Sequence, residues 1–400
     1  MNNSLTAVRF DHVDVIFGQR AQEAIGLLDQ GAGRDAILDK TNCLVAVHDA
    51  SVFVNEGEIL VLMGLSGSGK SSLLRCINGL NTVSRGKVLV HDGTGEVDVA
   101  SCDPETLRRL RRNRISMVFQ QFGLMPWLTV RDNVGFGLDI RGVPKAERER
   151  IVEDKIKLVR LDKFANKFSH ELSGGMQQRV GLARAFATEA DILLMDEPFS
   201  ALDPLIRDKL QDELLALQAR VKKTILFVSH DLDEALRLGD RISIMRHGRI
   251  VQTGVAQDIV LRPADDYVAE FVRRMNPLKV LTGAMVMRAR ALMERADDGL
   301  FLDAARRYRL RVDAVGAPTA LSLDGASHPL RAVDDDDACP EGERCVVVAP
   351  ASITLQGLIH IKRRTGHPVL LADGGQLLGV AGEAEIIAAL AARNRGANAA

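Results

Sequence analysis

The residues with the clearest capacity for chemistry form a glycine-rich segment, Gly64-Leu-Ser-Gly-Ser-Gly-Lys-Ser71, called the phosphate loop below. It fits the pattern G-x-x-x-x-G-K-S/T and lies between an apolar run, 58–63, and a helix predicted over 71–78. Glycines allow backbone N–H groups to turn inward around an anion, and the helix directs its positive end at the same anion. The context favours a nucleoside triphosphate site over a simple glycine-rich turn.

The polar side chains of this loop predict roles around a triphosphate. Lys70 would neutralise the β and γ phosphates, and the Ser71 hydroxyl would bind Mg²⁺. Asp196 follows the apolar run 192–195 and would hold the same ion directly or through water. ATP and Mg²⁺ are therefore the expected cofactors. Within the loop and the start of the helix, the residues expected to bind the nucleotide are Gly64, Ser66, Gly67, Ser68, Gly69, Lys70, Ser71 and Ser72.

Five further motifs are short, polar or glycine-rich, and each adjoins a predicted strand or helix. They are Met117-Val-Phe-Gln120, Leu172-Ser-Gly-Gly-Met-Gln-Gln-Arg179, Asp196-Glu-Pro198, Ser200-Ala-Leu-Asp203 and His230, which ends the apolar run 224–229. Taken singly they say little, because Ser-Gly-Gly is a common loop and a histidine at a strand end is commonly structural. Chance does not explain all of them standing in one order with the phosphate loop.

In this order the motifs resemble those of ABC transporter ATPase subunits, and the resemblance covers roughly 8–277. It implies that 172–179 is the ABC signature, placed over the γ-phosphate of a nucleotide bound by a second copy of the chain. Backbone N–H groups where its helix begins would form a further anion site. The residues that the resemblance assigns to this shared nucleotide site are Ser173, Gly174, Gly175, Gln177 and Asp203.

The resemblance also implies catalytic roles. Glu197 would polarise the attacking water, and His230 would sense or orient the γ-phosphate. Gln120 would contact the metal, alongside Ser71 and Asp196, and link it to membrane subunits. Phe17, in Val15-Ile-Phe-Gly18, resembles the aromatic residue that stacks on adenine.

The order of predicted elements indicates an α/β fold. From about residue 58 onward, β-branched runs alternate with amphipathic helical stretches, which is typical of a parallel sheet covered by helices. The resemblance specifies a P-loop NTPase of the ABC type, with a RecA-like core, an antiparallel β subdomain and a helical subdomain. We expect this domain over 1–277, with a Gly-, Ala- and Asp-rich insertion at about 18–41 that contains one helix.

A chain of 400 residues has room for a second domain, which we expect over 278–400. The stretch 354–390 resembles one CBS repeat, with a helix, a strand, a glycine turn, a second strand and a helix. Gly382-Glu-Ala-Glu385 replaces the repeat's Ser/Thr-x-x-Asp nucleotide feature, so adenine-nucleotide binding is not expected there. The region 278–350 is either a degenerate first repeat or a packing or dimerisation segment. The smaller domain is expected to be α+β and regulatory or dimerising.

Composition and charge exclude several classes of protein. The formal net charge of −1 gives no general attraction to nucleic acid, and five scattered cysteines do not suggest a disulfide framework. A solvated helical face explains the basic cluster 108–114. A single phosphate loop and signature argue against tandem translation factors, and the interval from Lys70 to Ser173 is too short for the coiled coil of repair ATPases. We therefore expect no nucleic-acid partner, although an ABC ATPase acting on nucleic acid is a remote alternative.

No apolar run approaches the roughly 20 residues that span a bilayer. We expect a peripheral protein on the cytoplasmic face of the inner (plasma) membrane. Its expected partners are a second copy of itself, integral-membrane permease subunits and, indirectly, a substrate-binding protein outside the cell.

Finer details resemble the quaternary-amine importers. They are the insertion after Phe17, the run 63–71 and Leu202-Asp-Pro-Leu-Ile-Arg207. The stretches 73–80, 98–102 and 125–128 look most like the choline branch. The predicted function is ATP-driven choline uptake, with glycine betaine or proline as the alternative cargo. This assignment depends on family analogy, because such a subunit contacts nucleotide and permease rather than the cargo.

Overall fold

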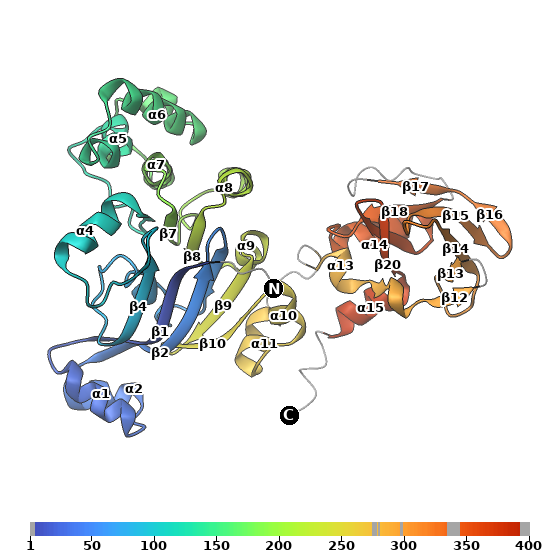
Figure 1. The fold of residues 1–400 in the computed structure, drawn as a ribbon, viewed down its shortest axis with the longest axis horizontal. Coiled ribbons are helices and arrows are strands. Elements are labelled where there is room, and N and C mark those ends of the chain that lie inside the picture. The colour runs from blue at the N-terminus through green and yellow to red at the C-terminus, as the bar shows by residue number, and fades with distance from the viewer. Residues whose placement is uncertain (1–4, 274–277, 279–280, 297–298, 334–344, 393–400) are drawn as a thin grey trace. The chain divides into compact units, whose positions relative to one another are not determined.

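The computed structural model describes residues 5–273, 278, 281–296, 299–333 and 345–392 of the chain (Figure 1). Contacts divide it into two compact units, Met1–Ile259 and Val260–Ala400. The domain boundary expected at 277/278 adjoins residues outside the described ones and stays a prediction. Within the described residues, no helix is both long enough and apolar enough to cross a membrane.

The first unit is built on a six-stranded sheet with the order β10-β9-β3-β8-β7-β6. The strands are β3 (Ile59–Met63), β6 (Ile115–Val118), β7 (Ile192–Asp196), β8 (Thr224–Val228), β9 (Arg241–Arg246) and β10 (Arg249–Gly254). The first five run parallel to their neighbours, and β10 returns antiparallel to β9. Every residue of β3, β7 and β8 is buried, as in a parallel sheet covered on both faces. The predicted parallel sheet is confirmed.

A four-stranded antiparallel sheet with the order β2-β1-β4-β5 lies beside the first. Its strands are β1 (Thr6–Phe17), β2 (Leu44–Asn55), β4 (Arg85–His91) and β5 (Glu96–Asp98). Apolar side chains from both sheets form one buried core, in which Phe10 of β1 and Leu62 of β3 both take part. The antiparallel β subdomain implied by the resemblance is therefore present.

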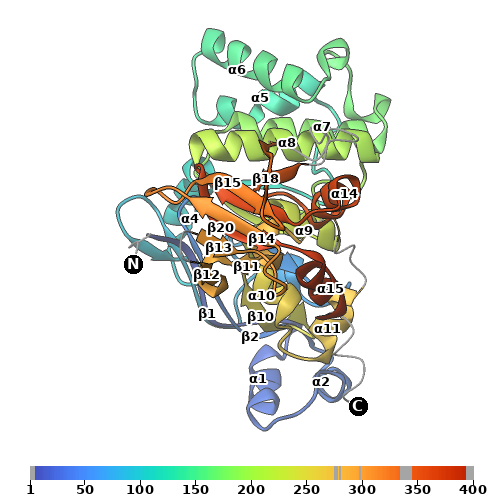
Figure 2. The ribbon, with the colours of Figure 1, turned by 90° about the vertical axis from the view of Figure 1, so that its right-hand side faces the viewer.

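Helices flank these sheets and form a separate lobe. The helices of the first unit after β3 are α3 (Lys70–Leu74), α4 (Pro104–Asn113), α5 (Val130–Ile140), α6 (Lys145–Leu158), α7 (Gly174–Ala187), α8 (Pro204–Val221) and α9 (Leu232–Leu238), followed by α10 (Ala256–Leu261) at the boundary between the units. Helices α5, α6 and α7 contact one another, and α5 and α6 stand away from the strands in both views (Figures 1 and 2). They correspond to the expected helical subdomain.

The segment expected as an insertion folds into two helices, α1 (Ala21–Asp29) and α2 (Arg34–Thr41). Ala24, Ile25 and Leu28 of α1 pack with Ile37 of α2 in a small core of their own. The sequence predicts the first helix but not the second. Only Ile37 and Thr41 of α2 are buried, so the apolar spacing that marks a helix is too sparse to detect.

The second unit contains helix α11 (Asp266–Arg273) near its start, followed by two sheets. One sheet is mixed, and the other is an antiparallel meander. The helix, strand, turn, strand and helix predicted over 354–390 are confirmed as α14 (Leu355–Thr365), β19 (Val369–Asp373), β20 (Gln376–Ala381) and α15 (Glu383–Ala392).

The meander was not predicted. The other α-helix and strands described in the unit are α13 (Gly283–Val286), β11 (Arg288–Ala289), β12 (Glu294–Ala296), β13 (Gly299–Phe301), β14 (Tyr308–Val312), β15 (Pro318–Leu323), β16 (Ala326–His328), β17 (Leu330–Ala332) and β18 (Val346–Pro350). The mixed sheet has the order β11-β20-β19-β18-β17, and the meander has the order β12-β13-β14-β15-β16. Most of these strands are too short for a visible alternation, and arginines interrupt β14. Tyr308 and Leu310 nevertheless alternate inward from β14 and are buried.

Truncating Phe10 to Ala should lower the free energy of unfolding of the first unit by about 3–5 kcal/mol, because the ring is buried where the two sheets meet. The matched control is Phe53→Ala on β2, whose ring is 44% exposed under the Arg241 guanidinium and should cost about 1 kcal/mol or less. Urea denaturation followed by the fluorescence of Trp127, the single tryptophan, measures both. Equal losses would contradict the proposed core.

Candidate nucleotide-binding and hydrolysis site

The phosphate loop connects β3 to α3 and is packed too tightly for side chains at two positions. At Gly64, with φ +144°, an added Cβ would lie 2.2 Å from the Met245 carbonyl oxygen. At Gly69, with φ +102°, it would lie 2.4 Å from the Ala46 carbonyl oxygen. Glycine is therefore required at both places by the close approach of β9 and β2.

Lys70 lies folded over this loop. Its Nζ donates hydrogen bonds to the carbonyl oxygens of Gly64 (2.9 Å) and Leu65 (3.0 Å). Burial lowers the pKa of Lys70 from its ordinary value, while the nearby charges of Glu197 and Asp196 oppose that shift. The ammonium group is thus held where it can meet the phosphates of a nucleotide.

The loop also fits a phosphate through Ser68. Its hydroxyl is buried, and its Oγ has no hydrogen-bond partner within the described part of the chain. Leaving a buried hydroxyl without a partner costs about 1–3 kcal/mol, which a phosphate oxygen at this place would relieve. Ser66 and Gly67 are exposed at the loop's outer turn, and Ser72 is half-buried in the first turn of α3.

The metal ligands predicted from the loop and from the end of β7 come together. The Ser71 hydroxyl donates a hydrogen bond of 2.6 Å to Oδ1 of Asp196, whose side chain is fully buried. A hydroxyl beside a carboxylate is the oxygen donor set that Mg²⁺ prefers, so these residues fit the ion. The other carboxylate oxygen, Oδ2, accepts a hydrogen bond of 2.8 Å from Nη2 of Arg75.

The three predicted catalytic residues also meet. Glu197 Oε2 accepts a hydrogen bond of 3.3 Å from the Gln120 side-chain amide and lies 3.4 Å from Nδ1 of His230. Gln120 was also predicted to contact the metal, but in this structure its side chain is hydrogen-bonded to Glu197. Glu197 itself adopts φ +48°, a left-handed backbone that is unfavourable for a non-glycine residue and tends to occur at functional sites.

The signature residues lie where α7 begins. Ser173 has an extended backbone just before the helix and makes no side-chain cap, and Gly174 and Gly175 form its first turn. Gln177 turns back on its own chain, because its amide donates to the carbonyl oxygens of Ser169 (2.9 Å) and Leu172 (3.2 Å). The side chain of Gln177 is thus engaged in holding the turn before the helix.

Asp203 ends the motif that follows Glu197. Its carboxylate accepts a hydrogen bond of 3.1 Å from the N–H of Ile206 and so caps α8. An added Cβ at Gly175 would lie 3.2 Å from the Ala201 carbonyl oxygen, so the start of α7 lies directly against this motif. The signature and the segment 200–203 therefore form one surface.

Two residues that lie beside predicted site residues were not singled out from the sequence. Leu44 of β2 is paired with Phe17 of β1, and both are exposed, by 48% and 41%, so they share one face at the sheet's end. The insertion separates them along the chain and hides this pairing. Arg75, which binds Asp196, could have been found, since it stands four residues after Ser71 and therefore on the same face of a helix.

Comparisons with known proteins identify the family. Residues 47–200 match the family model described as "ABC transporter". The chain is 50% identical over 273 residues to the glycine betaine/proline betaine transport system ATP-binding protein ProV of Escherichia coli (strain K12), covering 68% of this chain and 67% of ProV. This chain belongs to the ABC transporter ATP-binding family. As a member, it binds ATP and hydrolyses it in a transport system.

This ABC ATPase is also similar to other proteins of known function or structure. It is 39% identical over 398 residues to the glycine betaine transport ATP-binding protein OpuAA of Bacillus subtilis (strain 168), covering 98% of this chain and 94% of OpuAA. It is 42% identical over 228 residues to the choline transport ATP-binding protein OpuBA of the same strain, covering 57% and 58%. A solved dimer of the ATP-binding cassette MJ0796, bound to ADP and Pi, matches with TM-score 0.53 and 30% identity, covering 62% of this chain and 98% of MJ0796.

Replacing Phe17 by Ala should weaken ATP binding by about 5- to 100-fold, the scale of a lost base–aromatic stack. Binding of Mg²⁺-tripolyphosphate, which has no base, should change by less than about twofold, since it depends on the phosphate loop alone. Isothermal titration of both ligands measures this. Phe53→Ala, an equally exposed phenylalanine on the neighbouring strand, serves as the control. Unaltered ATP affinity in the Phe17 variant would remove Phe17 from the site.

Proposed function

We propose that this chain is the ATP-hydrolysing subunit of a bacterial importer of quaternary amines and that its cargo is glycine betaine. The observation that carries the motor function is the cluster in which Ser71 and Asp196 meet beside Glu197, Gln120 and His230. The cargo is supported by the similarity to OpuAA, which extends over nearly the whole chain. Choline, which the finer sequence details favour, is the second candidate, supported by the shorter match to OpuBA.

The geometry supports a division of labour during hydrolysis. Ser71 and Asp196 would hold Mg²⁺, which would supply positive charge to stabilise the phosphates of the nucleotide. Lys70 adds a second positive charge from within the loop. Gln120 and His230 both face Oε2 of Glu197, which orients the carboxylate and leaves Oε1 to accept a proton from the attacking water.

A second copy of the chain would complete the site. Gly174 and Gly175 present backbone N–H groups at the start of a 14-residue helix, and Ser173 makes no cap there. Such a helix end attracts an anion, so we propose that it binds the γ-phosphate held by the partner's phosphate loop. The dimeric state of the related MJ0796 cassette supports this arrangement. ATP would then join the two copies, and its hydrolysis would let them separate.

The helical lobe offers a surface for the permease. Trp127 is 72% exposed and lines a groove of about 410 Å³ together with residues of α5 and α6, among them Phe136 and Arg148. A large exposed aromatic beside a groove is typical of a protein interface. The segment from Gln120 to Trp127 would connect this interface to Glu197. We place the ATPase peripherally on the cytoplasmic side of the membrane, where ATP is supplied, with a substrate-binding protein acting on the other side.

Glu197→Gln should lower ATP turnover by about a hundredfold or more, the scale of a lost general base, while ATP binding is retained. Glutamine keeps the shape of the side chain and removes its basicity, so the comparison isolates the chemistry. Steady-state hydrolysis and nucleotide titration measure the two effects. Near-normal turnover in this variant would contradict the role proposed for Glu197.

Trp127→Ala should weaken association with the permease by about 30-fold or more, because truncating an interface tryptophan at a binding hot spot costs about 2 kcal/mol or more. Binding of ATP to the chain alone should stay within about twofold, since the groove lies outside the phosphate loop. Co-purification with the permease and nucleotide titration separate the two. Unchanged association would exclude this groove as the docking surface.

Uptake in cells that lack this gene tests the cargo. Complementation with the wild type should restore uptake of labelled glycine betaine, and Glu197→Gln should not. Restoration of choline uptake alone would favour the second candidate. Restoration of neither would contradict a quaternary-amine importer, while leaving the hydrolysis measurement unaffected.

A further inference from the structure

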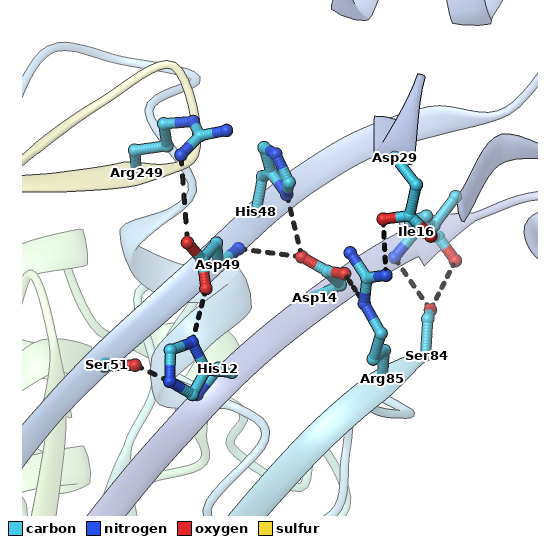
Figure 3. Close-up of polar contacts among 10 residues, drawn as sticks. All are labelled: His12, Asp14, Ile16, Asp29, His48, Asp49, Ser51, Ser84, Arg85 and Arg249. Atoms are coloured by element: carbon cyan, nitrogen blue, oxygen red, sulfur yellow. Dashed lines mark hydrogen bonds and ion pairs between the residues drawn. The ribbon is translucent and has the colours of Figure 1, made fainter. Parts of the chain in front are cut away.

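A polar cluster centred on one buried carboxylate lies in the antiparallel sheet and takes no part in the chemistry above (Figure 3). At its centre is Asp14 of β1, whose side chain is fully buried. Oδ1 accepts hydrogen bonds from Nδ1 of His48 (3.0 Å) and the N–H of Asp49 (2.7 Å), and Oδ2 accepts one from Nε of Arg85 (2.6 Å). Burial disfavours the charged form of Asp14, but these donors outweigh it and hold its pKa below the ordinary value.

Asp14 supports a bulge in β2. Val13 is paired with Ala50 and Val15 with Val47, so the backbone at Asp14 faces two residues, His48 and Asp49. Asp49 adopts φ +51°, a left-handed backbone that costs energy in a non-glycine residue. The hydrogen bond from its N–H to the buried carboxylate offsets that cost. The shape of the bulge therefore depends on Asp14.

The bulge carries the turn that holds the phosphate loop. The N–H of His48 donates to the Gly248 carbonyl (2.9 Å), and the N–H of Gly248 donates to the Ser68 carbonyl (3.0 Å). Gly248 lies in the turn between β9 and β10, and an added Cβ there would lie 2.9 Å from the Ala46 carbonyl oxygen. The turn between β9 and β10 is thus closely packed against β2. A continuous path of hydrogen bonds connects the Asp14 cluster with Ser68 of the phosphate loop.

The same cluster holds the strand that ends in Phe17. The backbone N–H of Ser84 donates a hydrogen bond to the backbone carbonyl of Asp14 (2.8 Å). The Ser84 Oγ accepts a hydrogen bond from the N–H of Ile16 (3.0 Å), the residue before Phe17. Arg85 extends the cluster outward, since its Nη1 donates to Asp29 of α1 at 2.7 Å. Figure 3 shows these contacts converging from β1, β2, β4 and the insertion.

We propose that Asp14 is a positioning residue for ATP, which together with His48 and Arg85 fixes the spacing between Phe17 and the phosphate loop. The inference rests on the proposed assignment of Phe17 to the base. ATP would be held at its base by Phe17 and at its phosphates by the phosphate loop. When these two contacts are the right distance apart, the second one forms at high effective concentration once the first has formed, and ATP binds tightly. A ligand that occupies the phosphate loop alone gains nothing from that spacing. Asp14 therefore sets the affinity for ATP but not for an inorganic triphosphate.

The variant Asp14→Asn tests this in the full-length chain. Asparagine has nearly the same shape, but it loses the charge and turns an amide donor toward the donors of His48 or Arg85. Affinity for Mg²⁺-ATP should fall by about tenfold, the scale of one hydrogen bond to a charged group. Affinity for Mg²⁺-tripolyphosphate should stay within about twofold of the wild type, since its contacts are those of the phosphate loop alone. Isothermal titration of the two ligands gives both values.

His12→Asn is the matched control. His12 meets Asp49 from the exposed side, with its Nδ1 2.7 Å from Asp49 Oδ1, and adopts φ +50°, which asparagine tolerates. Both affinities should remain at the wild-type level in this variant. Arg85→Gln is a second test variant, at the partly exposed edge of the cluster. If Asp14→Asn does not fold, Arg85→Gln tests the inference by itself. It should reduce ATP affinity by about threefold, consistent with losing one partner of a partly exposed pair, and leave tripolyphosphate unchanged.

Equal losses for the two ligands, or no loss for either, would overturn the inference. Equal losses would mean that Asp14 supports the phosphate loop or the fold in general. Failure of the proposed function is distinguishable, because a wild-type chain that does not bind ATP would contradict the nucleotide site itself. If the wild type binds ATP but Phe17→Ala leaves its affinity unaltered, the assignment of the base fails, and the inference fails with it.

Discussion

The close packing around the phosphate loop is the constraint on which the rest of this structure depends. Gly64 is pressed against the β9 carbonyl of Met245, and Gly69 against the β2 carbonyl of Ala46. The phosphate loop is thus in close contact with the central sheet at Gly64 and with the antiparallel sheet at Gly69. Because both sheets hold the loop in place, the spacing between the phosphate loop and the strand that carries Phe17 is fixed. The hydrogen bond from Gly248 to Ser68 strengthens the same link.

Charge at the site is balanced over short distances. Asp196 is neutralised by Arg75, and Lys70 lies within the influence of both Asp196 and Glu197. These four side chains carry two positive and two negative charges, so they leave little net charge to attract a triphosphate. A divalent cation would then be needed to offset the charge of the nucleotide, and the Ser71 hydroxyl and the Asp196 carboxylate, which meet where the phosphate loop faces the end of β7, would hold it.

The sequence predicts those parts of the site that depend on strand ends and local motifs. Ser71 and Asp196 meet because parallel strands end at one edge of the sheet, and the same rule brings His230 to Glu197. Features created by tertiary contacts escape prediction. Nothing in Val47-His-Asp-Ala50 marks a bulge, and its dependence on Asp14 appears only once β1 and β2 are paired. The arginines of β14 likewise conceal the alternation of Tyr308 and Leu310.

Mixing two inactive variants tests most directly whether ATP is hydrolysed at a site shared by two copies of the chain. Lys70→Ala disables the phosphate loop and Ser173→Arg blocks the signature, so neither variant alone should hydrolyse ATP in the presence of the permease. In a mixed dimer, the intact loop of one copy faces the intact signature of the other. Random pairing should then restore about a quarter of the wild-type rate for a symmetric dimer. A mixture as inactive as its components would contradict the shared site.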